Sequence, residues 1–382
     1  MSEHTEELPP QQGDPSEPAK RRVVARRRLP LWAAIPILIV GLMAGTAIGL
    51  QVSELTREAD PGALTIVNAS VKRTPGVLSV DPPGARSLTS FEGYGTWIDV
   101  FDYAPAYAAK GTKVSAADLP EMASLGVKTL YVQAARLDSR SPMGLVDPWL
   151  LAEILAAAHR NEIEVVAWYL PKWSEDDADL ERVKMLRDFE VLGDRFDGLA
   201  LDIEWIGDLD TETRNARLVD LSSEARRALG TDPLGAIVLP PVLTEVVNTD
   251  YWPDFPWSDI SDSYDVWMPM SYWSFRSQKS GYGDGYAYNE ESTRRLRENL
   301  DDANAAVHGI GGIGGTDGVN DDPNPEEPLT SLNELDAFVA SLVDTGSIGG
   351  SVYDWATLEP EARQRLAQLF GEGPGSLLPS IS

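Results

Sequence analysis

From about residue 93 to residue 370, short apolar segments rich in Val, Ile, Tyr and Trp alternate with longer segments of helical periodicity. The predicted strands are Gly95–Phe101, Lys128–Gln133, Glu164–Leu170, Gly198–Ile203, Gly235–Leu239, Val266–Tyr272, Ala306–Ile310 and Gly349–Tyr353. The predicted helices are Ala116–Leu125, Pro148–Arg160, Asp176–Leu192, Thr211–Leu229, Asn289–Ala305, Ser331–Asp344 and Glu359–Phe370. The fifth connection, Thr244–Ser263, is rich in Pro and Trp and only weakly helical.

This repeated order of strand and helix predicts an α/β fold, and two layouts are compatible with it. Eight units over roughly 280 residues suit a (β/α)8 TIM barrel, which typically takes about 250 residues. A doubly wound open sheet would usually carry a Gly-rich phosphate loop after its first strand. The first predicted strand ends instead in Trp97-Ile98-Asp99-Val100-Phe101-Asp102. The sequence therefore favours the barrel.

The charge and the absence of cysteine exclude several classes of function. The 382 residues carry a formal net charge of -28 and include no Cys and three His, namely His4, His159 and His308. A field this negative opposes nucleic-acid binding, which needs Lys and Arg on phosphates. Without Cys there are no disulfides and no Cys-based metal centres. We expect no cofactor, no metal site and no nucleic-acid partner, and the sequence does not indicate the oligomeric state.

The N-terminal region predicts a single membrane anchor. Residues 29–53 carry no charge and are long enough for their apolar part to span a bilayer. Six bases precede this segment, which places residues 1–28, a disordered tail, in the cytoplasm and the barrel outside. The alternative is a cleaved signal peptide and a secreted protein. Residues 54–92 are predicted as a linker or stalk, 93–372 as the catalytic-type barrel and 373–382 as a flexible tail.

The fourth predicted strand carries the strongest candidate site. Side chains alternate between the two faces of a strand, so Ala200, Asp202 and Glu204 share the face that points into the barrel. Barrel enzymes keep their chemistry at the C-terminal ends of the strands. Two carboxyl groups about 7 Å apart at Cα raise the pKa of one member, which can then act as a general acid.

The segment from Phe196 to Glu204 resembles the signature of the chitinase-like glycoside hydrolases of family 18. That signature reads aliphatic or aromatic, Asp, Gly, aliphatic, Asp, aliphatic, Asp, any residue, Glu, and Ala200 stands at its first Asp of the Asp-x-Asp-x-Glu core. Met270-Ser271-Tyr272-Trp273 is similar to the family's Met-x-Tyr-Asp element, with Trp273 in place of Asp. Gly349–Trp355 is similar to its eighth strand.

This resemblance implies a mechanism. Glu204 would protonate the glycosidic oxygen, and Asp202 would orient a 2-acetamido group whose carbonyl attacks the anomeric carbon in place of an enzyme nucleophile. Tyr272 would hydrogen-bond the same acetamido group, and Trp355 would stack on the sugar. Independently, the seventh predicted strand ends in a Gly-rich segment without a carboxylate before Asp317, where many retaining barrel glycosidases keep their second acid. The predicted substrate is a β-linked polysaccharide of the chitin, peptidoglycan or glucan type.

The departures at Ala200 and Trp273 keep a second hypothesis open, a catalytically impaired protein that binds glycans in the cell envelope. A third is a barrel with a structural role only. Asp99 or Asp102 at the end of the first predicted strand, or Asp354 after the eighth, could supply a compensating carboxylate, and spacing alone assigns none of them.

Further candidates for sugar binding lie near other strand ends. Aromatic faces stack on sugar rings, and polar groups bind hydroxyls. The stacking candidates are Trp97, Trp205, Trp273 and Trp355, and the hydrogen-bonding candidates are Gln133, with Arg136 after it, and Tyr169.

Overall fold

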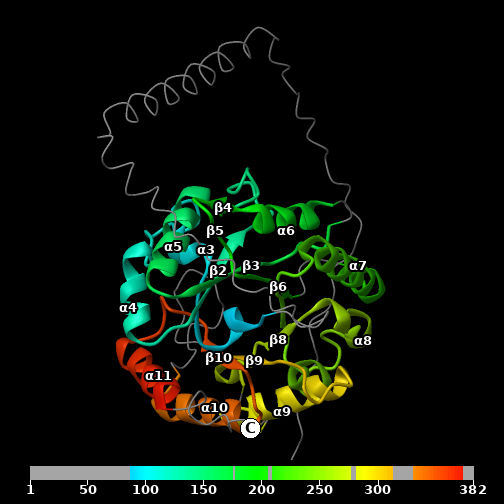
Figure 1. Ribbon diagram of the computed structural model, residues 1–382. Coiled ribbons are helices and arrows are strands. Elements are labelled where there is room, and N and C mark those ends of the chain that lie inside the picture. The colour runs from blue at the N-terminus through cyan, green and yellow to red at the C-terminus, as the bar shows by residue number, and fades with distance from the viewer. Residues whose placement is uncertain (1–86, 175–176, 205–208, 277–280, 313–329, 373–382) are drawn as a thin grey trace, which may run out of the picture. The chain divides into compact units, whose positions relative to one another are not determined.

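The computed structural model describes residues 87–174, 177–204, 209–276, 281–312 and 330–372. Within these ranges eight parallel strands form a ring, and helices surround it (Figure 1). The strands are β1 (Gly93–Ile98), β2 (Thr129–Ala135), β3 (Glu164–Tyr169), β6 (Gly198–Ile203), β7 (Leu234–Val238), β8 (Val266–Pro269), β9 (His308–Gly311) and β10 (Gly349–Val352). The fold is therefore a (β/α)8 barrel, as the sequence predicts.

Each strand pairs with its neighbours in chain order, and β1 also pairs with β10. The remaining contact, between β8 and β9, consists of single bridges, Trp267 with Val307 and Met270 with Ile310. The amide of Ser271 also donates to the carbonyl oxygen of Ile310 at 2.8 Å. These bonds join the two ends of the sheet, so the barrel is nearly closed.

The helices lie between successive strands. They are α3 (Val100–Tyr103), α4 (Leu119–Ser124), α5 (Pro148–Arg160), α6 (Ala178–Asp188), α7 (Thr211–Leu229), α8 (Trp257–Ile260), α9 (Gly285–Asn299), α10 (Leu332–Asp344) and α11 (Pro360–Glu372). A two-stranded hairpin of β4 (Glu190–Val191) and β5 (Asp194–Arg195) precedes β6. The predicted helices Pro148–Arg160 and Thr211–Leu229 have the observed bounds. The fifth connection contains short helical turns.

Two predicted strands end three residues earlier than expected. The first stops at Ile98 because Asp99 and Asp102 form a capping box that begins α3: Asp99 accepts the amide of Phe101, and Asp102 accepts the amide of Asp99. The sixth stops at Pro269, and the amides of Tyr272 and Trp273 then turn back to the carbonyl oxygens of Met270 and Ser271, at 2.9 Å each. Tyr272 therefore lies in the turn that follows β8.

Large side chains from alternate strand positions fill the inside of the barrel. This inner core contains Phe91, Trp97, Tyr131, Val166, Trp168, Ala200, Ile237, Val266, Met268, Met270 and Ile310. Phe91 belongs to a short 3₁₀ helix, Thr89–Phe91, that falls within the predicted linker 54–92. Gly198 and Gly235 make room for its ring, since a Cβ at either position would approach it to 3.0 or 2.8 Å. Residues before Gly93 thus contribute to the barrel core.

His159 joins α5 to the segment that leads into β6. Its Nε2 lies 2.9 Å from Asp197, and its Nδ1 lies 3.3 Å from Asp194. The hydrogen bond to Asp197 raises the pKa of His159 from 6.5 to about 9. The folded state therefore favours the protonated ring, and this stabilisation is complete below the unfolded pKa of 6.5 and is lost as the pH rises through 9.

We predict that His159→Gln lowers the free energy of unfolding most below about pH 6, and that this difference shrinks as the pH rises toward about 9. Urea unfolding of both proteins across this range measures the difference. A difference that does not change with pH would show that the protonated ring adds nothing.

The tail, anchor and most of the stalk predicted for residues 1–92 lie outside the described residues, as does the predicted tail 373–382. Among the helices that the structure describes, none combines the length and the apolar character that crossing a bilayer requires.

Candidate active site

A cavity of about 370 Å³ opens at the C-terminal ends of the strands. Its walls come from strands all around the barrel, so residues far apart in sequence converge there. It is lined by Trp97, Asp99, Phe101, Gln133, Arg136, Trp168, Leu170, Asp202, Glu204, Ile237, Met270, Tyr272, Ile310 and Tyr353. The three proposed catalytic residues, Glu204, Asp202 and Tyr272, therefore border one space, together with Trp97, Asp99, Gln133 and Met270.

The alternation along β6 follows the sequence pattern. Leu199, Leu201 and Ile203 pack in the outer core between barrel and helices, whereas Ala200 packs in the inner core. Asp202 and Glu204 continue the inward series at the end of the strand and line the cavity.

Burial controls the protonation of this carboxyl pair. Asp202 is 7% exposed, and its Oδ1 has no hydrogen-bond partner among the described residues. Burial, and then the nearby Glu204 carboxyl, raises the pKa of Asp202 well above its usual range. Burial also raises the pKa of Glu204. The pair therefore tends to retain a proton at neutral pH, which a general acid requires.

Trp173 and Tyr272 both interact with this carboxyl pair. The indole Nε1 of Trp173 donates to the backbone oxygen of Glu204 at 2.9 Å, which holds the chain where β6 ends. Burial, and then the carboxyls of Asp202 and Glu204, raises the pKa of Tyr272 well above its usual range. Tyr272 thus keeps its hydroxyl proton and can donate a hydrogen bond to a ligand.

Aromatic rings form one side of the cavity. Trp97 stacks on Tyr131 with 4.3 Å between ring centres and meets Trp168 edge-on at 6.0 Å. Its Nε1 donates to Ser351 Oγ at 2.8 Å, so the ring is fixed. The Nε1 of Trp168, by contrast, is buried and has no partner among the described residues. A ligand hydroxyl or carbonyl could accept from it.

Asp99 and Gln133 already have structural partners. The hydroxyl of Tyr353 donates to Asp99 Oδ2 at 2.6 Å, and the Phe101 amide donates to Asp99 Oδ1 at 2.6 Å. Gln133 Oε1 accepts the amide of Val100 at 3.3 Å. Both residues therefore help to hold the wall of the cavity.

Three residues predicted to bind sugar do not line the cavity. Tyr169 points outward from β3, where its hydroxyl donates to Asp179 at 2.5 Å. Trp273 is 1% exposed and packs against Phe338 in the outer core. Trp355 is also 1% exposed and lies under the guanidinium of Arg363 at 4.0 Å. Contrary to the expectation that Trp273 and Trp355 stack on a sugar, neither ring faces the cavity, because the surrounding helices cover both. Trp205 lies outside the described residues.

Trp168 and Tyr353 line the cavity, although the sequence did not predict them as site residues. Trp168 precedes Tyr169 and therefore points to the opposite, inner face of β3. Its pairing partner in register is Ala200 of β6, which also faces inward. Two-residue alternation along β3 was the available signal. Tyr353 follows β10 and partly fills the same inner region.

Asp99, Asp102 and Asp354 form the described carboxylate group with ligand atoms close enough for a metal ion, all within 4.8 Å of one another. Internal hydrogen bonds use much of this group: Tyr353 and Phe101 donate to Asp99, the Asp99 amide donates to Asp102, and the Thr357 amide donates to Asp354. Burial, with the adjacent carboxyls, raises the pKa of Asp102. These contacts describe a capping network that adjoins the cavity.

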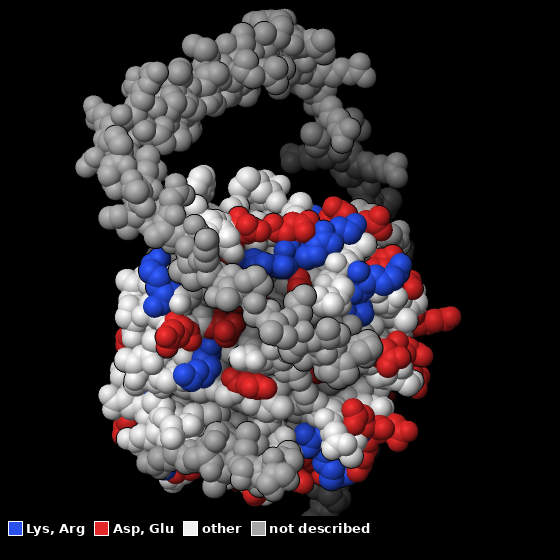
Figure 2. Space-filling model, viewed as in Figure 1, with Lys and Arg blue, Asp and Glu red and all other residues white. Residues whose placement is uncertain are grey.

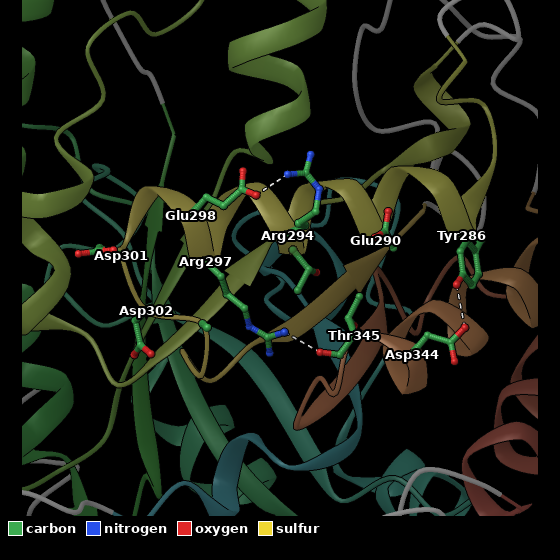
Figure 3. Close-up of a pocket in the computed structure, with 11 residues that line it drawn as sticks. Tyr286, Glu290, Arg294, Arg297, Glu298, Asp301, Asp302, Asp344 and Thr345 are labelled. Atoms are coloured by element: carbon green, nitrogen blue, oxygen red, sulfur yellow. Dashed lines mark hydrogen bonds and ion pairs between the residues drawn. The ribbon is translucent and has the colours of Figure 1, made fainter.

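A larger cavity, of about 690 Å³, lies along α9 and the end of α10 (Figure 3). Several of its side chains bond one another or the backbone: Arg294 pairs with Glu298, Tyr286 donates to Asp344, and Arg297 donates to the backbone oxygen of Thr345. None of the predicted site residues borders it, and its lining residues lie on α9, at the end of α10 and in the segments that precede β9 and β10, away from the C-terminal ends of the strands. The smaller cavity is therefore the candidate active site.

Charged side chains of both signs are interspersed on the surface seen in Figure 2, where Lys and Arg lie beside Asp and Glu. Near the top of the described part, a row of Lys and Arg atoms lies directly against a row of Asp and Glu atoms.

The barrel is similar to solved glycoside hydrolase structures. The C-terminal domain of a putative chitinase from Desulfitobacterium hafniense DCB-2 aligns with a TM-score of 0.52 and 13% identity, covering 74% of this chain and 99% of that chain. The family GH18 chitinase from Cycas revoluta, in complex with allosamidin, aligns with a TM-score of 0.51 and 12% identity, covering 73% and 99%. No protein-family model and no curated protein matches the sequence. Likeness at this identity establishes the fold alone.

Proposed function

We propose that this protein is a glycoside hydrolase that cleaves a β-linked polysaccharide in the cavity at the end of β6. The observation that carries the proposal is the carboxyl pair Asp202 and Glu204. Asp202 is buried with an unpartnered Oδ1, beside Glu204, in a cavity that also presents fixed aromatic rings. A buried polar atom without a partner costs free energy unless a ligand satisfies it.

In the proposed reaction Glu204 donates its proton to the glycosidic oxygen as the bond to the anomeric carbon breaks. Asp202 binds the group that attacks the anomeric carbon, which is the substrate's own 2-acetamido carbonyl if the resemblance to family 18 extends to mechanism. Tyr272 donates a hydrogen bond to that group. The rings of Trp97 and Trp168 contact the apolar face of the sugar.

The experiment is hydrolysis by the full-length chain of chitin, peptidoglycan and glucan oligomers, followed by mass spectrometry of the products. Cleavage of one of these substrates that depends on Glu204 supports the proposal. If none is cleaved, the protein is not a glycosidase of the proposed type.

A second candidate, a glycan-binding protein without turnover, is favoured by Ala200. This residue is 1% exposed and packs in the inner core, where a Cβ on Gly235 would lie 3.3 Å from its own Cβ. Asp202 thus has no carboxyl two residues before it on the inward face of β6 with which to exchange a proton. Binding of an oligomer without cleavage, unchanged by Glu204→Gln, would favour this candidate.

We also propose that residues 29–53 anchor the barrel outside the cell membrane. The uncharged segment and the six bases before it support this arrangement. We expect the protein to stay in the membrane fraction after alkaline extraction with its N-terminus intact. A soluble product that begins after residue 44 or 47 would instead show cleavage and secretion.

A further inference from the structure

Among the described residues that line the candidate active site, one is a cation, the guanidinium of Arg136, which follows β2. It lies 5.5 Å from the ring centre of Phe101 and 5.6 Å from that of Tyr107, so two aromatic rings support it. Among the residues that the structure describes, no acidic side chain pairs with this guanidinium and no oxygen accepts a hydrogen bond from it. In a chain of net charge -28, a half-buried arginine without a carboxylate in ion-pair contact is unusual.

Arg140 provides the contrast. Its guanidinium lies over the same Tyr107 ring at 4.1 Å, but it pairs with Asp138. Arg140 Nε donates to Asp138 Oδ1 at 2.9 Å, and its second nitrogen donates to Oδ2 at 2.8 Å. Both oxygens of Asp138, an acidic residue close to Arg136, are thus occupied. Arg140 does not line the cavity.

The carboxyls that share the cavity with Arg136 have other partners or favour their neutral form. Asp99 accepts from Tyr353 and from the Phe101 amide. Burial favours the protonated forms of Asp202 and Glu204. The positive charge of Arg136 is therefore available to a ligand.

We propose that Arg136 binds the carboxylate of an acidic sugar, so that the substrate is a glycan that bears carboxyl groups, such as a uronic acid or a lactyl ether on the ring. The planar guanidinium presents two parallel N–H donors that match a carboxylate. This inference rests on the proposed function, since it places a sugar in the same cavity. It further specifies that the sugar carries a negative charge.

The test compares matched ligands. Binding of a uronate-containing oligosaccharide and of its carboxyl-reduced, neutral counterpart to the full-length chain is measured by calorimetry, and a muramic-acid oligosaccharide forms a third arm. We expect Arg136→Gln to weaken binding of one or both acidic ligands by about tenfold to hundredfold and to leave the neutral ligand unchanged. Arg136→Lys keeps the positive charge but loses the two parallel N–H donors, so its affinity for the acidic ligands should lie between those of the native chain and Arg136→Gln. Arg160→Gln, at an exposed arginine on α5 that does not line the cavity, is the control and should change none of the three.

The uronate and muramic-acid ligands carry their carboxylate at different places on the sugar. Comparing the two therefore shows which kind of acidic sugar Arg136 binds. Equal affinity of the native chain for the acidic and reduced ligands would overturn the inference, and so would an equal loss of both in Arg136→Gln. Cleavage of neutral oligomers that depends on Glu204 but not on Arg136 would leave the hydrolase proposal standing alone. Acidic ligands bound through Arg136 but never cleaved would support the inference and refute the hydrolase.

Discussion

Replacing Glu204 with Gln is expected to lower kcat for glycan cleavage by about 10²- to 10⁴-fold, because glutamine keeps the shape of the side chain but cannot donate a proton as a carboxylic acid does. The folded state should persist, since the side chain lies at the mouth of the barrel beyond the end of β6. Affinity for the substrate should change little. Initial rates with an oligomer that the native chain cleaves, together with the binding constant, separate these effects.

Glu153→Gln is the matched control for this substitution. Glu153 is exposed on α5 and makes no contact with the cavity. It should retain the rate of the native chain. A Glu204→Gln protein with a native rate would contradict the assignment of the acid, even if the native chain cleaves glycans.

Replacing Phe91 with Ala is expected to lower the free energy of unfolding by about 3–5 kcal/mol. The ring is completely buried, lies 6.2 Å from the Tyr131 ring and rests against two glycines that leave it space. His308 Nδ1–H donates to the backbone oxygen of Phe91 at 2.8 Å, so the segment is held independently of its side chain. Loss of the ring would leave a cavity that the fixed strands cannot close. Urea unfolding measures the change.

Phe91→Leu, which keeps most of the apolar volume, should cost less than Phe91→Ala. Leu192→Ala is the surface control, because Leu192 is 100% exposed, and its effect should stay within about 0.5 kcal/mol. A change of that small size in Phe91→Ala would show that the Phe91 ring does not stabilise the barrel core.

Periodicity predicts most of the barrel because each strand and helix buries one regular face. The alternation in β6 predicts which side Asp202 and Glu204 face, since a two-residue period fixes orientation once the strand is located. The same rule was available in β3, where it selects Trp168 and rejects Tyr169.

Residues beyond the strands are harder to predict, because turns set their direction. Trp273 and Trp355 follow β8 and β10 by a few residues, and the chain turns them into the layer between barrel and helices. Hydrogen bonds between distant segments decide this: the amide of Trp355 donates to the backbone oxygen of Trp97 at 3.0 Å. Arg136 likewise depends on Phe101 and Tyr107, which only the folded chain brings beside it.

The most direct measurement is a crystal structure of the Glu204→Gln protein with a bound oligosaccharide. The proposed function predicts a sugar in the cavity at the end of β6, with a glycosidic oxygen about 2.6–3.2 Å from the side chain at position 204 and a polar substituent on Asp202 Oδ1. An oligosaccharide seated elsewhere, for example along α9, or one whose glycosidic oxygens all lie beyond reach of position 204, would contradict it.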